Sequence, residues 1–206
     1  MVGLQLWRGA FVLADFILEN GPSMFTSKNV LELGSGVGLT SIVASFFAQK
    51  MVSTDVPAEG ILELIDRNFK RNSGFVKSSY RVMPFDFFDQ EWSEELCSIV
   101  SETDIVLAAD VVYDDSLTEA FVETLTKILS TEKKKTIFVA LEKRYVFTVA
   151  DLDTVAPCYE YFLECIRRVW NKPPMSQWGM KSLSINFARY FIYKRNSDIV
   201  LWQITN

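Results

Sequence analysis

Short apolar runs alternate with amphipathic segments along most of the chain. The runs are rich in Val, Ile, Leu and Ala and have the length of buried strands. They lie at 30–33, 51–54, 104–109 and 136–141, with an outer run at 80–83. Helical periodicity between them predicts helices over 7–18, 39–48, 58–72, 116–129 and 158–170. We expect Asn20-Gly21-Pro22 to end the first helix and Asn72-Ser73-Gly74 to end the third.

The C-terminal part follows a different pattern. Residues Ser184–Tyr193 and Ile199–Ile204 alternate between apolar and polar side chains, with Lys194-Arg195-Asn196-Ser197 between them. This pattern predicts a β-hairpin turned at 194–197. Alternating strands and helices followed by a hairpin indicate an α/β fold, with a mostly parallel sheet that has an antiparallel edge.

Length and composition favour one folded domain over residues 1–206. The chain has 206 residues, of which 49% are hydrophobic and 23% are charged, so it can fill a large core. It shows no internal repeat and no linker. No apolar run is as long as a membrane span, and the first residues do not form a signal peptide. The chain opens almost directly into Leu4-Gln-Leu-Trp7, so we expect a catalytic fragment whose natural N-terminal extension is missing.

Charge and residue types exclude several kinds of chemistry. The formal net charge is -5, which disfavours a nucleic-acid partner. The chain has no histidine, which removes the usual Ser-His-Asp and Cys-His machinery and most zinc sites, so we expect no metal. Three cysteines without paired spacing do not form a disulfide framework. We therefore place the protein in a reducing, intracellular compartment, in the nucleus or the cytoplasm, and expect a monomer.

The segment Val30-Leu-Glu-Leu-Gly-Ser-Gly-Val-Gly38 is the strongest chemical signal. An apolar strand, a glycine turn and a helix start bring backbone close to a nucleotide-like ligand. The third glycine comes one residue too early for a dinucleotide motif, and no phosphate-binding P-loop is present. Glu32 before the turn suits a cationic ligand, and Asp55, after the next strand, suits ribose hydroxyls. S-adenosylmethionine fits both residues, because it carries a positively charged methionine end and a ribose. The alternative is a tight strand-to-helix turn that binds no ligand.

Two further signals flank this motif. Asp110-Val-Val-Tyr113 follows a strand, at the sheet edge where ligands of α/β proteins bind. Its carboxylate and phenol could hold an attacking amine, although an ordinary strand exit with a capping Asp110 explains the spacing as well. Trp7 could lie over a cationic ligand or belong to the core. Glu142-Lys-Arg144, at the end of another strand, is either a substrate rim or a solvated loop.

Together these segments resemble family 16 of the seven-stranded S-adenosylmethionine-dependent methyltransferases, which are largely protein-lysine methyltransferases. The matching pieces are Leu6–Asp15, Leu31–Leu39, Ala108–Asp115 and Glu142–Arg144, which are distributed over most of the chain. The glycine motif identifies only the superfamily, whereas the Asp-x-x-Tyr motif joined to the leading Trp-Arg-Gly-Ala is more specific. The resemblance implies a Rossmann-like three-layer sandwich around a seven-stranded sheet, and methyl transfer to the ε-amine of a lysine in a protein substrate.

The resemblance also implies a role for each matching residue. The cofactor would be contacted by Trp7, Glu32, Gly34, Ser35, Gly36, Asp55, Asp86, Phe87 and Ala109. Asp55 would bind the ribose, and Asp86 and Phe87 would flank the adenine. Asp110 and Tyr113 would shape the channel for the target lysine and orient its amine. Phe87 stands where many relatives have Trp, and it keeps the stacking surface without the indole N–H.

Three other functions fit parts of this pattern. Amino methyltransferases that act on nucleic-acid bases carry two prolines between the acidic or amide residue and the aromatic residue, and Asp110-Val-Val-Tyr113 lacks them. Methylation of a small metabolite would use the same cofactor site. A non-catalytic adaptor could keep the fold as a binding surface, although the glycines and Asp55 are intact.

Overall fold

The computed structural model describes residues 4–58, 60–148, 153–171 and 173–206. Its centre is a seven-stranded sheet in the order β3-β2-β1-β4-β5-β9-β8. The strands are β1 (Asn29–Leu33), β2 (Lys50–Asp55), β3 (Ser79–Pro84), β4 (Ile105–Ala109), β5 (Thr136–Glu142), β8 (Gly179–Leu183) and β9 (Ile199–Thr205). The first five are parallel, and β9 is antiparallel to both of its neighbours. The expected fold class is confirmed.

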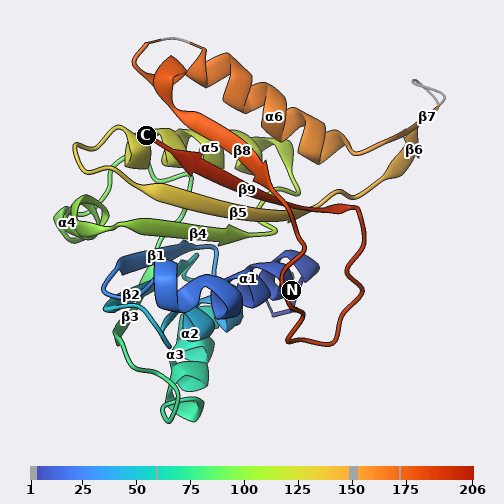
Figure 1. The fold of residues 1–206 in the computed structure, drawn as a ribbon. Helices are drawn as coiled ribbons and strands as arrows, with labels where there is room; N and C mark the ends of the chain where they lie inside the picture. Colours follow the sequence, from blue (N-terminus) through green and yellow to red (C-terminus); the bar gives the residue numbers. More distant parts are fainter. Residues whose placement is uncertain (1–3, 59, 149–152, 172) are drawn as a thin grey trace.

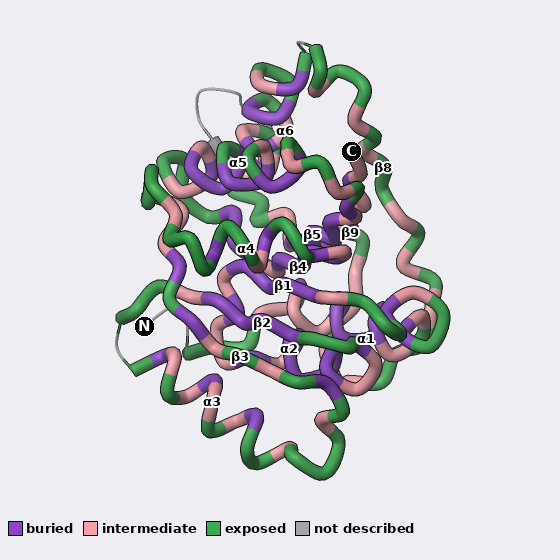
Figure 2. Tube along the Cα trace, turned by 90° about the vertical axis from the view of Figure 1, so that its left-hand side faces the viewer, coloured by how far each residue is buried: buried purple, intermediate pink, exposed green. Residues whose placement is uncertain are grey.

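Helices cover both faces of this sheet, giving three layers (Figure 1). On one face lie α1 (Arg8–Met24), α2 (Leu39–Ala44) and α3 (Ile61–Arg71), and on the other α4 (Glu94–Glu102), α5 (Asp115–Leu129) and α6 (Pro157–Trp170). Strand residues alternate between the two cores: Ile105 and Leu107 of β4 pack toward α1, and Val106 and Ala108 toward α5. The central strands β1, β4 and β5 are the most deeply buried part of the sheet, whereas its edge strands β3 and β8 are largely exposed (Figure 2).

Parallel pairing brings the functional strand ends together. Strand β1 lies between β2 and β4, with Leu33 level with Thr54 on one side and Ala108 on the other. The glycine turn, Asp55 and Asp110 therefore leave the sheet at the same edge. This is the edge at which a doubly wound sheet reverses its strand order and binds ligands.

The predicted C-terminal hairpin is wrong in its first strand. Strand β8 covers 179–183, and residues 184–198 form a long connection that crosses α1 before β9 begins. Ile185, Phe187 and Phe191 of this connection pack against the core on the α1 face. The backbone N–H groups of Tyr190 and Phe191 donate to the buried Asp15 of α1, at 2.8 and 3.3 Å, so a side chain replaces the expected strand partner.

The helix ends differ from expectation in smaller ways. Helix α1 continues to Met24 through the expected stop at 20–22, with Pro22 inside it. Asn20 Nδ2 donates to the carbonyl of Phe16 at 2.9 Å, so its side chain bonds back to the helix instead of ending it. Helix α3 begins at Ile61 rather than Ala58, and Glu59 lies outside the described residues. The sequence reasoning missed α4, which Ser93 caps by accepting from the Leu96 N–H at 3.1 Å.

Two short elements complete the description. The strands β6 (Val146–Thr148) and β7 (Asp153–Val155) pair into a separate antiparallel ribbon, and η1 (Met175–Gln177) is one 3₁₀ turn. Neither was expected. Among the described residues, no helix combines the length and the apolar character that crossing a membrane requires.

Candidate active site

The glycine turn lies directly after β1. Gly34, Gly36 and Gly38 have φ values of 65°, 56° and 86°, all in the left-handed region. At Gly34 a Cβ would also lie 2.8 Å from Cγ1 of Val111, so only glycine fits there. The Ser35 N–H donates to the carbonyl of Thr54 at 2.9 Å, which fixes the turn against β2. The turn is therefore packed between the ends of β2 and β4.

Asp55 ends β2 and holds the turn from the other side. Its Oδ2 accepts from the Gly36 N–H at 2.7 Å, and its Oδ1 accepts from the Val56 N–H at 2.8 Å. Burial raises the pKa of this carboxyl, and the two N–H groups partly oppose that shift. Each carboxylate oxygen can accept more than one hydrogen bond. Asp55 can thus organise the turn and still accept from the hydroxyls of a ribose.

Glu32 lies beneath the turn in a chain of buried polar side chains. Its carboxylate accepts a short hydrogen bond from Ser41 of α2. Ser53 Oγ of β2 lies 2.9 Å from Ser41 Oγ and 2.7 Å from Ser35 Oγ, so the chain continues back to the turn. Burial raises the pKa of Glu32 to about 7, although the serine hydroxyls act in the opposite direction. At neutral pH this carboxyl is therefore close to half ionised.

An aromatic wall comes from the loop after β3. Phe87 packs against Phe85, with ring centres 5.7 Å apart, and against Phe121 of α5 at 5.4 Å. Asp86 Oδ1 accepts from the Phe88 N–H at 3.0 Å, which shapes this loop. A flat ligand ring would find apolar and aromatic surface here.

The opposite wall is built by the end of β4 and the start of α1. Asp110 has a φ of 53°, and its carboxylate accepts from the Gly9 N–H at 2.6 Å and from the Glu142 N–H at 2.9 Å. Burial raises the pKa of Asp110, and these two N–H groups oppose the rise. The α5 helix has its own cap, because Asp114 Oδ1 accepts from the Leu117 N–H at 3.0 Å.

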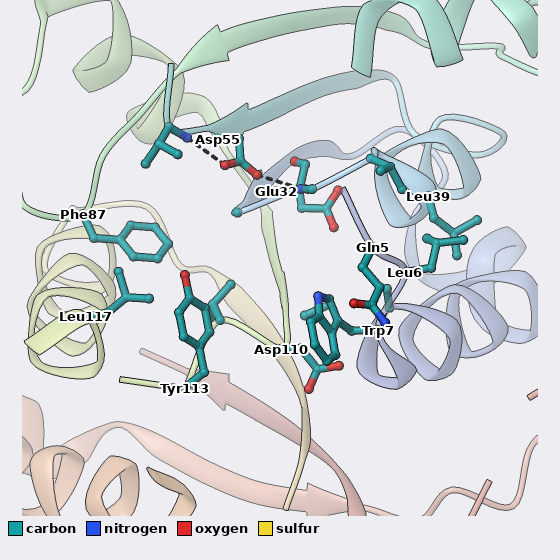
Figure 3. A pocket seen from close by; sticks show the side chains of 18 of the residues that line it. Gln5, Leu6, Trp7, Glu32, Leu39, Asp55, Phe87, Asp110, Tyr113 and Leu117 are labelled. Carbon is teal, nitrogen blue, oxygen red and sulfur yellow. Dashed lines mark hydrogen bonds between the residues drawn. The ribbon is translucent and has the colours of Figure 1, made fainter. Parts of the chain in front are cut away.

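Tyr113 occupies the mouth of the site. Its side chain is half-exposed and its hydroxyl points toward Phe87 (Figure 3). Partial burial raises the pKa of the phenol, and the negative charge of Asp55 raises it further. The hydroxyl therefore stays protonated at neutral pH and can donate a hydrogen bond.

All eleven residues expected at the site line one cavity of about 180 Å³ (Figure 3). Sequence reasoning missed part of the lining, namely Gln5, Leu6, Ala10, Val37, Leu39, Val56, Phe85, Val111 and Leu117. Most of these adjoin the predicted residues in the chain, so the motifs and the rest of the lining lie in the same region. Phe85 and Leu117 had no signal in the sequence, because single apolar residues are far more often core.

The Glu142-Lys-Arg144 segment is held against the start of α1, so it is not simply a solvated loop. Glu142 forms an ion pair with Arg8, with 2.6 Å between Oε1 and the guanidinium nitrogen. The Arg144 guanidinium lies over the Trp7 ring, 4.5 Å from its centre. Both contacts join the end of β5 to the start of α1.

A doubly wound sheet, an acidic glycine turn and a carboxylate at the end of β2 are typical of α/β enzymes that bind nucleoside-containing ligands, and the comparisons narrow the class. Residues 1–156 match the family model described as lysine methyltransferase. The chain therefore belongs to the lysine methyltransferase family.

Individual relatives agree with this assignment. The chain is 32% identical to human Methyltransferase-like protein 22 over 98% of its own length and 54% of the relative's. It is 28% identical to mouse Protein-lysine N-methyltransferase EEF2KMT, over 98% of this chain and 58% of that one. The chain thus spans a little over half the length of these curated relatives. Among solved structures, the tRNA (m1A58) methyltransferase TrmI of Aquifex aeolicus superimposes with a TM-score of 0.57 at 15% identity, covering 98% of this chain and 70% of that one. That likeness shows the shared fold.

Proposed function

We propose that this protein is an S-adenosylmethionine-dependent protein-lysine N-methyltransferase. The observation that carries the proposal is the convergence of the glycine turn, Glu32, Asp55, Trp7 and Tyr113 on one cavity in a chain of the lysine methyltransferase family. When bound, S-adenosylmethionine supplies a methyl group on a sulfonium, and the amine nitrogen forms the new N–C bond as the S–C bond breaks.

The residues fit this cofactor in three places. Asp55 has lone pairs left for ribose hydroxyls after its two backbone contacts. Phe85, Asp86 and Phe87 offer aromatic surface and a carboxylate to an adenine. Glu32 places a negative charge under the turn, where an amino group or a sulfonium would be stabilised. Ala109 and the exposed backbone of Gly34, Ser35 and Gly36 at the cavity wall complete the proposed contacts.

The target amine must lose its proton before transfer, because a lysine has a pKa near 10.4 when free. Entry into a partly dry channel lowers that pKa, and the proton goes to solvent. Tyr113, at the mouth, would narrow the channel and donate or accept a hydrogen bond there. Positive charge moves from sulfur to nitrogen, so alignment and exclusion of water are the main contributions of the protein.

The test is transfer of radiolabelled methyl groups from S-adenosylmethionine into proteins of a cell extract. Wild type should label protein bands, and acid hydrolysis should release label as methyl-lysine. Asp55→Ala should lose the labelling, whereas Glu63→Gln, on an exposed part of α3, should keep it. Label that nuclease removes, or that appears only in small molecules, would contradict the protein substrate. Absence of S-adenosylhomocysteine binding by calorimetry would favour a non-catalytic adaptor.

We further propose an intracellular compartment, in the nucleus or the cytoplasm, and a monomer. Cys97, Cys158 and Cys165 are all free thiols, which agrees with reducing surroundings.

A further inference from the structure

The first turn of α1 has no cap of its own. Trp7 occupies the N-cap position and makes no side-chain capping hydrogen bond, and no acidic residue lies in the first turn. The first N–H groups of a helix need partners from outside the helix. The Gly9 N–H finds one in Oδ2 of Asp110, which is 101 positions away in the chain and 2.6 Å away in space. A residue of the Asp-x-x-Tyr motif therefore caps a helix to which it does not belong.

The same carboxylate also holds the end of β5. Its Oδ1 accepts from the Glu142 N–H at 2.9 Å, so both carboxylate oxygens bind backbone N–H groups. Two further contacts also join the start of α1 to the end of β5. Arg8 pairs with the Glu142 carboxylate at 2.6 Å, and the Arg144 guanidinium covers the Trp7 ring. Residues 7–9 and 142–144 are thus joined twice directly and once through Asp110, and we call this set of contacts the α1 clasp.

The α1 clasp leaves no space for a side chain at Gly9. A Cβ at Gly9 would lie 2.6 Å from Oδ2 of Asp110 and 2.8 Å from the carbonyl oxygen of Ala140. Gly9 does not line the cavity, whereas Trp7 and Ala10 on either side of it do. The closeness of α1 to the sheet therefore determines where the Trp7 ring lies.

We propose that Asp110 is a positioning residue: it caps α1 from the end of β4 and, with Glu142 and Arg144, holds Trp7 as a wall of the cofactor cavity. This inference rests on the proposed function, since it concerns the same cavity. Asp110 is only 7% exposed, and its carboxylate is directed at the backbone of α1 and β5, so we infer that its main effect falls on cofactor binding rather than on capture of the target amine.

The test is calorimetric titration of S-adenosylhomocysteine into wild type and variants that disturb the α1 clasp. Asp110→Asn presents an N–H₂ group to one of the two N–H donors, and Gly9→Ala forces α1 away from the sheet. Each should raise the Kd by about five- to tenfold, the size of a lost helix cap. Arg144→Ala, at an exposed side chain, should raise it by about threefold without endangering the fold. Gly74→Ala is the matched control, because a Cβ there meets nothing within 4 Å.

Two readouts separate positioning from a merely structural role. In a Trp7→Ala background, Asp110→Asn should change the Kd by less than about twofold, because its effect passes through the ring. Methyl transfer to extract proteins by Asp110→Asn should return toward the wild-type rate when S-adenosylmethionine is raised well above its weakened Kd.

Other results would overturn the inference. If Asp110→Asn, Gly9→Ala and Arg144→Ala all bind S-adenosylhomocysteine as wild type does, the α1 clasp does not position the cavity wall. If transfer stays low at saturating S-adenosylmethionine, Asp110 acts on the target amine instead. Either result leaves the proposed function intact, because wild type still binds and transfers. If wild type itself binds no S-adenosylhomocysteine, both proposals fall.

Discussion

The pKa of Glu32 predicts that cofactor affinity falls in mildly acidic solution. This carboxyl is buried under the glycine turn, and burial raises its pKa to about 7. A cationic amino group or sulfonium binds to the ionised form, so the affinity is reduced by the fraction of protein in which Glu32 is ionised. With a pKa of about 7, that fraction is about one tenth at pH 6 and about nine tenths at pH 8. The apparent Kd should therefore rise by about tenfold between pH 8 and pH 6.

Calorimetry with S-adenosylhomocysteine at several pH values between 5.5 and 8.5, roughly one and a half units on each side of that pKa, is the appropriate assay. Glu32→Gln supplies the control, because it keeps a polar group beside Ser41 and removes the titration. Any titration of the ligand itself is common to both proteins, so the ratio of their Kd values isolates Glu32. A wild-type profile parallel to that of Glu32→Gln, or a wild-type affinity that rises as the pH falls, would refute the reasoning.

The remaining predictions concern stability. Because the folded-state pKa of Glu32 is raised, its ionisation costs stability as the pH rises from about 4.5 through about 7. In urea titrations, the unfolding free energy of Glu32→Gln should accordingly exceed that of wild type by up to about 3 kcal/mol at pH 8 and by almost nothing at pH 4.5. Gly34→Ala should lose about 1–3 kcal/mol of unfolding free energy and weaken S-adenosylhomocysteine binding, since it puts a Cβ at positive φ against a side chain, whereas Gly74→Ala should match wild type. Asp15→Ala should lose about 3–5 kcal/mol of unfolding free energy, because it leaves the guanidinium of Arg195 without its ion-pair partner and only 15% of that side chain is exposed. A loss below about 1 kcal/mol would show that this pair contributes little.

The chain predicts much of this fold because its strands are short, apolar and regularly spaced. The parallel strands and the helices between them, apart from α4, follow from periodicity, and the glycine turn and Asp55 lie in the cavity. The wrong prediction at the C-terminal hairpin has a specific cause. Residues 184–193 alternate like a strand, but Asp15 of α1 takes the N–H groups of Tyr190 and Phe191, and no local pattern shows a partner so distant in sequence.

The same limit explains the partial success at the site. Asp110 and Tyr113 were placed correctly at the end of β4, whereas the hydrogen bonds from Gly9 and Glu142 to Asp110 depend on two strands and a helix meeting in space. Spacing shows which residues share a sheet edge. It does not show which of their atoms are already satisfied by backbone groups.

The pairing of Asp15 with Arg195 has a consequence for biosynthesis. The two residues are 180 positions apart, at 2.6 Å, and Asp15 is fully buried. Helix α1 therefore depends on a partner that is synthesised 180 residues later. Contacts between such distant parts of a chain form late and slowly. A nascent chain that ends before Tyr190 would leave that carboxylate without its partners at residues 190–195, so we expect α1 to settle only after this segment has been made.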